Sequence, residues 1–269
     1  MEIIMKGKII VTGIGPGGYE DMTIRAVRAI SDCDVIVGYT VYTELIRKVF
    51  REQGNPLDKE IFTTPMKKET ERARIAFEQA SEGRTVCMVC SGDSGVYGMA
   101  GLIYELSTDY PDVDIEIISG VTAALSGGAL LGAPISHDFS VISLSDLLTP
   151  WDIIEKRLEA AASSDMVICL YNPASRKRTW QLNRACRIML KYKDEGTVCG
   201  AAISIGRDGE RYEIMTLKDL AEYKADMFTT IFIGNSQTEV IAKKQDSVDS
   251  DKGKNDHKKM VTPRGYRLE

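Results

Sequence analysis

The sequence is poor in histidine, the side chain that titrates closest to neutral pH. It holds only two among 269 residues. His257 falls in a stretch that we expect to be a flexible tail, so His137 is the main histidine candidate for acid–base chemistry. A loop histidine that satisfies a helix end is an equally good interpretation of His137.

Apolar runs long enough to span a bilayer are also missing. The stretch from residue 3 to residue 14 is interrupted by Lys6, Gly7 and Lys8, and a membrane-spanning helix needs about 20 apolar residues. We therefore expect no membrane partner and, with no recognisable signal peptide, a cytoplasmic protein. The net charge of −5 argues against nucleic acid as a partner, because phosphate contacts need clustered Lys and Arg.

The six cysteines form no cluster that would suggest an iron–sulfur domain. Cys87 and Cys90 have the spacing of a chelating pair, but positions i and i+3 of a strand point to opposite faces. We expect reduced thiols that pack in the core, and no metal site.

Apolar runs alternate with amphipathic segments, which predicts an α/β fold. The predicted strands are 8–12, 35–37, 85–90, 113–118, 139–144, 166–170, 198–205, 211–215 and 229–233. The predicted helices are 23–30, 67–82, 99–106, 123–131, 151–162 and 179–191. The pattern predicts two α/β domains, 1–120 and 121–242, with a mixed sheet in the second and a flexible charged tail at 243–269.

Two local predictions concern individual side chains. In the helix at 67–82, the charged residues are expected to face water and the apolar ones the core; Arg72 is counted among the charged residues. Thr149-Pro150-Trp151-Asp152 has the pattern of a capping box with proline at the first helical position.

The first glycine-rich loop, at 13–18, matches G-x-G-x-x-G literally. A dinucleotide site would need a helix directly after the third glycine and an acidic residue about 20 positions on. Residues 19–22 precede the helix instead, and the strand at 35–37 ends in Gly38-Tyr39. A nicotinamide or flavin site is therefore disfavoured. The loop still allows a small ligand to approach its backbone closely.

A second loop, Ser91-Gly92-Asp93-Ser94-Gly95, follows the apolar strand at 85–90. Ligands of open α/β sheets bind beyond the carboxyl ends of strands. Asp93 would there be a fixed acceptor for a hydroxyl or amine, or alternatively the cap of the next helix.

The order of three glycine junctions resembles the tetrapyrrole methylases, which methylate corrin and sirohaem precursors with S-adenosylmethionine. The resemblance covers about residues 8–235 and rests on Gly13-x-Gly15-Pro16-Gly17, Ser91-Gly92-Asp93-Ser94-Gly95-x-Tyr97-Gly98 and Ser119-Gly120-x-Thr122-Ala123. Stretches 136–151, 170–178 and 260–266 resemble the branch that methylates C17 of a cobalamin precursor, precorrin-3B or cobalt-factor III, with ring contraction. The family implies two α/β domains with the donor in the cleft between them, S-adenosylhomocysteine as product, and a homodimer.

The resemblance also implies which residues hold the donor. Carried over by motif, they are Pro16, Ser91, Gly92, Asp93, Val96, Thr122, Ala123, Asn172 and, as a looser match, Gly206. Ser94 departs from the family pattern, because many members have proline after the aspartate.

Ring contraction needs acid–base help at oxygen. The candidates are His137, Asp146 and Ser143 as catalytic residues, and Ser145, Arg176 and Arg178 as contacts to the substrate, a tetrapyrrole rich in carboxylates. A solvated basic turn is the alternative for the arginines. Alternatives for the whole chain are a methylase for another corrin position, a nucleotide-binding oxidoreductase, and a sensor that binds the methyl donor without turnover.

Overall fold

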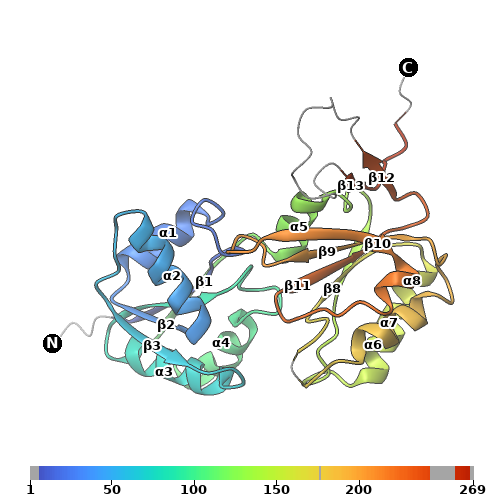
Figure 1. Cartoon of the computed structure of the whole chain (residues 1–269). Helices are drawn as coiled ribbons and strands as arrows, with labels where there is room; N and C mark the ends of the chain where they lie inside the picture. Colours follow the sequence, from blue (N-terminus) through green and yellow to red (C-terminus); the bar gives the residue numbers. More distant parts are fainter. Residues whose placement is uncertain (1–5, 176, 243–257, 267–269) are drawn as a thin grey trace. The chain divides into compact units, whose positions relative to one another are not determined.

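The computed structural model describes residues 6–175, 177–242 and 258–266. The chain divides into two compact units, Met1–Ala123 and Ala124–Glu269, called here the N-terminal and the C-terminal unit. Figure 1 labels their elements. None of the helices in the described ranges is long and apolar enough to cross a bilayer.

The N-terminal unit is built on a parallel five-stranded sheet of order β3-β2-β4-β1-β5. Its strands are β1 (Lys8–Gly13), β2 (Val35–Tyr39), β3 (Glu60–Thr64), β4 (Thr85–Cys90) and β5 (Asp114–Ile118). Its helices are α1 (Ile24–Asp32), α2 (Thr40–Glu52), α3 (Glu69–Ser81), α4 (Ala100–Leu106) and the 3-10 turn η1 (Ser107–Asp109).

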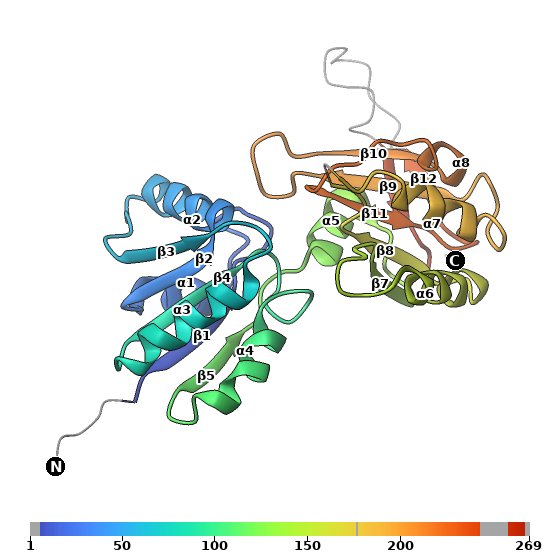
Figure 2. The ribbon, with the colours of Figure 1, turned by 90° about the horizontal axis from the view of Figure 1, so that it is seen from below.

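Helices cover both faces of this sheet, which explains why its inner strands are apolar throughout. Met88 and Cys90 of β4 pack with α3 and α4 on one face, and Cys87 and Val89 pack with α1 and α2 on the other. Figure 2 views the sheet with α3 and α4 in front of it. Cys87 and Cys90 thus lie on opposite faces, as their spacing predicts.

The C-terminal unit contains a mixed five-stranded sheet of order β10-β9-β11-β8-β7. Its strands are β7 (Phe139–Ser143), β8 (Val167–Tyr171), β9 (Val198–Ile203), β10 (Arg211–Thr216) and β11 (Thr229–Ile233). Its helices are α5 (Ala123–Leu131), α6 (Trp151–Ser163), α7 (Gln181–Met189) and α8 (Leu217–Leu220). Strand β7 is parallel to β8, while β11 is antiparallel to both β8 and β9.

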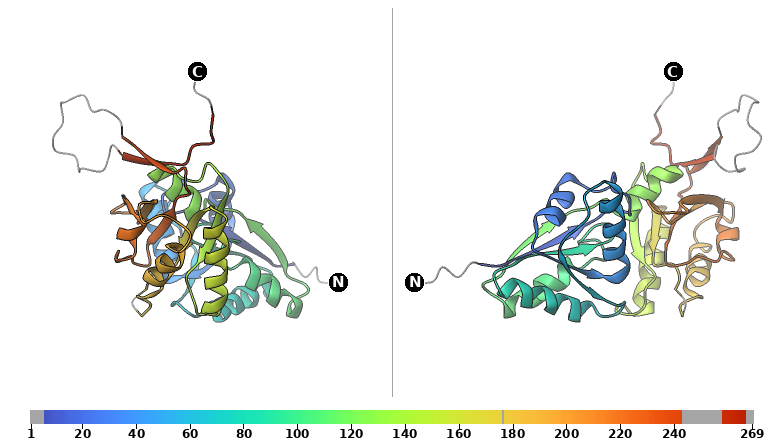
Figure 3. Two further views of the ribbon diagram at one scale, coloured as in Figure 1. Left: turned by 90° about the vertical axis from the view of Figure 1, so that its right-hand side faces the viewer. Right: turned by 60° about the vertical axis from the view of Figure 1, so that its left-hand side comes forward.

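A second, small sheet joins three short strands of the C-terminal unit, β12 (Glu239–Ala242), β13 (Lys258–Val261) and β6 (Gly132–Ala133). Figure 3 shows β12 and β13 side by side. Met260 of β13 is fully buried. The prediction of a flexible tail is therefore wrong for residues 258–261, and residues 243–257 lie outside the described part of the chain.

Two side-chain predictions are wrong. Helix α6 begins after Pro150, and no side chain caps it, so the capping box predicted from Thr149 is not formed. Arg72 lies on the inner face of α3 and is only 4% exposed, because it stands four residues before the buried Ala76 on the same helix stripe.

Three buried thiols should make the protein sensitive to alkali. Burial raises the pKa of Cys90 to about 11 and the pKa values of Cys169 and Cys186 to about 12, from an ordinary value of 9.0. In the unfolded chain these thiols ionise near pH 9, so the stability that the neutral thiols provide is complete below pH 9 and is lost as pH rises towards their folded values.

We expect the free energy of unfolding to fall between pH 8 and pH 10 by on the order of 1 kcal/mol per thiol. Urea unfolding monitored by tryptophan fluorescence at both pH values measures this loss. Cys169→Ala should lower stability at pH 8, through the cavity that it leaves, and should also make the alkaline loss smaller. An unchanged loss in this variant would contradict the assignment to the thiols.

Candidate active site

The first group of candidate residues gathers at one edge of the N-terminal sheet. Strands β4, β1 and β5 are neighbours and parallel, so the three glycine loops that follow them meet at their carboxyl ends. The first two loops pair directly: the Gly15 N–H donates to the Gly92 carbonyl at 3.1 Å, and the Gly92 N–H donates to the Gly15 carbonyl at 2.7 Å.

The loops approach each other so closely that side chains are excluded. A Cβ atom on Gly120 would lie 2.2 Å from the Gly92 oxygen and 2.7 Å from the Gly13 oxygen. A Cβ atom on Gly13 would lie 2.7 Å from both the Gly120 nitrogen and the Gly92 oxygen. These contacts are with backbone atoms, which cannot rotate away, so the junction of β1, β4 and β5 requires glycine.

The Asp93 carboxylate ties two of these loops together. Its Oδ1 accepts from the Gly95 and Val96 N–H groups at 2.8 and 3.2 Å, and its Oδ2 accepts from the Gly120 N–H at 2.9 Å. A carboxylate offers about four acceptor positions, so Oδ2 keeps one for a ligand. Asp93 therefore acts foremost as the organiser of the loops, and its predicted role as a ligand acceptor is restricted to one oxygen.

Ser94 takes over the position at which many family members have proline. It is fully buried, and its Oγ donates to the Ile118 carbonyl at the end of β5 at 3.0 Å. The Ala100 N–H at the start of α4 donates to the Ser94 carbonyl at 3.0 Å. Ser94 thus fixes the turn through its hydrogen bonds, which the sequence alone did not predict.

The other predicted donor residues of this unit lie around the same junction. Pro16 is buried directly after Gly15, and Ser91, Val96 and Thr122 are half-buried. The Cα of Thr122 would lie 3.7 Å from a Cβ on Gly92, so the β5 loop contacts the β4 loop there. Ala123 follows as the first residue of α5.

The second group of candidate residues gathers at one edge of the C-terminal sheet, where β7 and β8 end together. Asn172 follows β8 with a left-handed backbone, φ 53°, and its Nδ2 donates to Ser143 Oγ at 2.9 Å. The same oxygen accepts from the Ser145 N–H at 3.2 Å. A non-glycine residue held at positive φ is typical of functional sites.

Arg178 joins these two strand ends. Its Nη1 donates to the Leu144 and Asn172 carbonyls, each at 3.2 Å. It lies in a turn closed by hydrogen bonds with Ser175, and α7 begins only at Gln181, two residues after the predicted start at 179. Arg176 lies outside the described residues.

Asp146 lies at the same edge, where the half-buried carboxylate accepts from Gln181 Nε2 at 3.3 Å. Gln181 is itself 1% exposed, and sequence reasoning missed it because nothing marks a glutamine at a helix start as functional. Gly206 follows β9 at φ 67°, and its N–H donates to Glu210 Oε2 at 2.6 Å.

His137 does not join this group. It precedes β7, whereas Ser143 ends that strand, and a five-residue strand is about 13 Å long. The imidazole is exposed, and its Nδ1 accepts from the Asp138 N–H at 2.9 Å. The structure therefore does not bring His137 together with the other two catalytic candidates, Ser143 and Asp146, because β7 runs between them.

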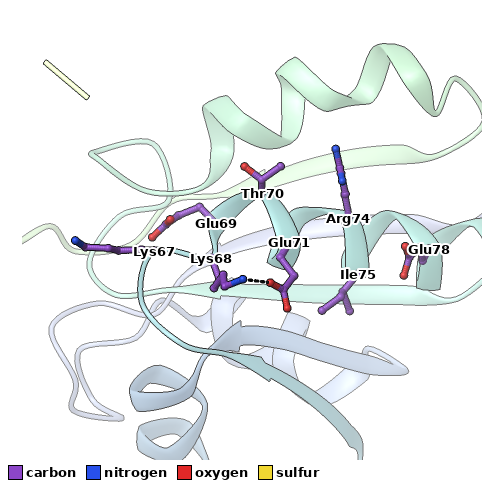
Figure 4. Close-up of a pocket in the computed structure, with 8 residues that line it drawn as sticks. All are labelled: Lys67, Lys68, Glu69, Thr70, Glu71, Arg74, Ile75 and Glu78. Carbon is purple, nitrogen blue, oxygen red and sulfur yellow. Dashed lines mark ion pairs between the residues drawn. The ribbon is translucent and has the colours of Figure 1, made fainter. Parts of the chain in front are cut away.

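Two further features of the described residues concern the kind of site. Within the described ranges, no group of three or more His, Cys, Asp or Glu residues is placed to hold a metal ion. An open groove runs along the outer side of α3, lined by charged residues that include Lys67, Lys68 and Glu71 (Figure 4). None of its lining residues belongs to the glycine junction or to the ends of β7 and β8.

Comparison with known proteins gives a consistent result. Residues 8–221 match the Tetrapyrrole (Corrin/Porphyrin) Methylases. A Salmonella typhimurium protein named probable cobalt-factor III C(17)-methyltransferase is 43% identical, over 96% of this chain and 99% of that protein. A cobalt-factor III methyltransferase of Priestia megaterium is 44% identical over 98% of this chain and 46% of that protein, so the chain spans about half the length of that relative.

Among solved structures, the methyltransferase CobJ superposes with a TM-score of 0.78 at 34% identity, over 87% of this chain and 96% of that one. The α/β units and their glycine loops therefore define a methyltransferase fold. The chain belongs to the tetrapyrrole methylase family.

Proposed function

We propose that this protein is an S-adenosylmethionine-dependent C-methyltransferase that methylates C17 of cobalt-factor III or precorrin-3B and contracts the macrocycle. The proposal is supported by the relatives named for the cobalt-factor III reaction at 43 and 44% identity. The observation that carries it is the three-loop glycine junction locked by Asp93, because ligands of open α/β sheets bind beyond the carboxyl ends of strands, where this junction lies.

The residues at the N-terminal edge suit the donor. Glycine at 13 and 120 lets the three loops pack backbone to backbone, and Asp93 Oδ2 keeps one acceptor position for a hydroxyl or amine. The donor supplies an activated methyl group on sulfur, and its transfer to carbon is an in-line displacement. The protein's contribution to that step is alignment, which rigid loops provide before the ligand binds.

The residues at the C-terminal edge suit the acceptor. Asp146 offers a carboxylate for proton transfer at oxygen, Ser143 and Ser145 offer hydroxyls, and Arg178 places a cation at the ends of β7 and β8. Asp146 is the preferred acid–base candidate for ring contraction, since His137 lies at the opposite end of β7. Asn172 would contact the donor from this unit.

The remaining parts of the proposal concern context. We propose that the two compact units are the two functional domains, with β13 belonging to the second, that the protein works in the cytoplasm as a homodimer, and that neither membrane nor nucleic acid is a partner. The net charge of −5 is consistent with the last point.

Anaerobic turnover with S-adenosylmethionine tests the function. Cobalt-factor III and metal-free precorrin-3B are offered separately, and the product's mass and absorption spectrum are recorded. We expect a mass gain of one methyl group, with the spectral change of ring contraction, on one acceptor. A protein that binds S-adenosylhomocysteine but methylates neither acceptor would refute the C17 assignment and favour another corrin position or a sensor.

A further inference from the structure

Arg72 is a buried cation without a carboxylate partner among the residues that the structure describes. Its Nη2 donates to the Pro65 carbonyl at 3.2 Å, and its Nη1 contacts Met99 Sδ at 3.6 Å, a weak acceptor. Its Cζ lies 5.9 Å from the centroid of the Tyr39 ring. The Nε atom is buried with no partner at all. Arginine stays charged in proteins, and a buried unpaired charge is costly.

A second unpartnered atom belongs to Thr64, the neighbour of a residue that Arg72 contacts. Thr64 is 2% exposed, and its Oγ1 is buried without a hydrogen-bond partner. Thr64 immediately precedes Pro65, whose carbonyl binds Arg72. Buried polar atoms are nearly always paired, and an exception needs an explanation. Here two of them, a hydroxyl and a guanidinium N–H, occur together.

These atoms lie at the functional edge of the N-terminal sheet. Tyr39 and Thr64 are paired final residues of β2 and β3, and all strands of this sheet are parallel, so their ends lie on the same side as the glycine junction after β4. The segment that covers them is short: residues 65–68 are all exposed. Lys67 holds a left-handed backbone, φ 68°, and it lines the open groove of Figure 4 together with Lys68.

We infer that Arg72 and Thr64 form a carboxylate-binding site at the ends of β2 and β3. Guanidinium N–H groups bind a carboxylate through two parallel hydrogen bonds, and a hydroxyl adds a third. A carboxylate would neutralise the buried charge and satisfy both unpartnered atoms. It can come from the methionyl part of the methyl donor or from an acid side chain of the macrocycle; both sources rest on the proposed function, the first on its donor alone and the second on its acceptor.

Calorimetric titration of four proteins tests the inference: the wild type, Arg72→Met, Thr64→Val, and the control Arg28→Met on the exposed face of α1. The ligands are S-adenosylhomocysteine, its decarboxylated analogue, and cobalt-factor III. We expect Arg72→Met to weaken a carboxylate-bearing ligand by at least about ten-fold and Thr64→Val to weaken the same ligand by about three-fold. Arg28→Met should stay within about two-fold of the wild type.

The pattern of losses identifies the source. A loss for S-adenosylhomocysteine but not for its decarboxylated analogue assigns the site to the donor. A loss for cobalt-factor III alone assigns it to the macrocycle. Equal losses for S-adenosylhomocysteine and the analogue, or changes below about two-fold for every ligand, would overturn the inference and make Arg72 a structural brace.

Thermal unfolding separates a binding role of Thr64 from a structural one, because a structural role predicts a lower melting temperature for Thr64→Val. Thr64→Val removes an unpartnered hydroxyl without changing shape, so its melting temperature should be no lower than that of the wild type. If Arg72→Met does not fold, Thr64→Val alone decides, because it should bind more weakly while unfolding no earlier. The donor titrations need no acceptor, so their outcome is independent of the turnover experiment that tests the proposed function.

Discussion

Asp93→Asn is expected to weaken S-adenosylhomocysteine binding by at least about 100-fold and to lower the free energy of unfolding by about 3 kcal/mol. Three backbone N–H groups now point at one carboxylate. An asparagine has one acceptor oxygen, so whichever way the amide turns, its NH₂ group faces an N–H donor, and the β4 and β5 loops lose their tie.

Calorimetry and urea unfolding measure the two effects of Asp93→Asn. Asp109→Asn in the exposed η1 turn makes the same chemical change away from the junction and should alter neither by more than about 0.5 kcal/mol. Binding by Asp93→Asn within about ten-fold of the wild type would show that the glycine contacts alone keep the loops in place.

Gly120→Ala should have the second largest effect, a loss of about 3 kcal/mol of stability together with most of the affinity for S-adenosylhomocysteine. The new methyl group would lie 2.2 Å from the Gly92 oxygen, so the β4 and β5 loops must separate. The hydrogen bond from the Gly120 N–H to Asp93 would lengthen with them.

Gly101→Ala is the matched control for this change. Gly101 lies inside α4, and a Cβ there would meet nothing within 4 Å. Alanine favours helix over glycine, so this variant should be more stable by about 0.5–1 kcal/mol and bind normally. Similar urea midpoints for Gly120→Ala and Gly101→Ala would contradict the close packing of the junction.

Local sequence patterns were enough to predict much of the sheet and helix framework. Strand β4 has the predicted bounds, 85–90, because its apolar run is flanked by polar residues and glycine. Strand β11 and helix α5 also match their predicted ranges. Helix α2 was missed although its buried Ile46, Val49 and Phe50 follow helical spacing. Strand β3 was missed because it is an edge strand in which only Thr64 is buried.

Contacts between distant parts of the chain set the limit of prediction at the site. The sequence places Asp93 in a loop. Asp93 accepts a hydrogen bond from Gly120, 27 residues away, only because β4 and β5 flank β1 in the sheet. His137 is six residues from Ser143 in sequence, yet the strand separates them. Arg72 was predicted to be exposed to solvent because it is charged, although its position in the helix places it towards the core.

The small sheet of the C-terminal unit has a consequence for synthesis on the ribosome. Met260 and Val261 pair with Gly132 and Ala133, and Thr262 Oγ1 donates to the Pro134 carbonyl at 2.6 Å. The N-terminal unit has its five strands within the first 118 residues and is able to fold while translation continues. The small sheet of the C-terminal unit cannot form until residue 262 emerges from the ribosome. A ribosome stalled before that codon would therefore hold a folded N-terminal unit and a C-terminal unit in which β6 is not yet paired with β13.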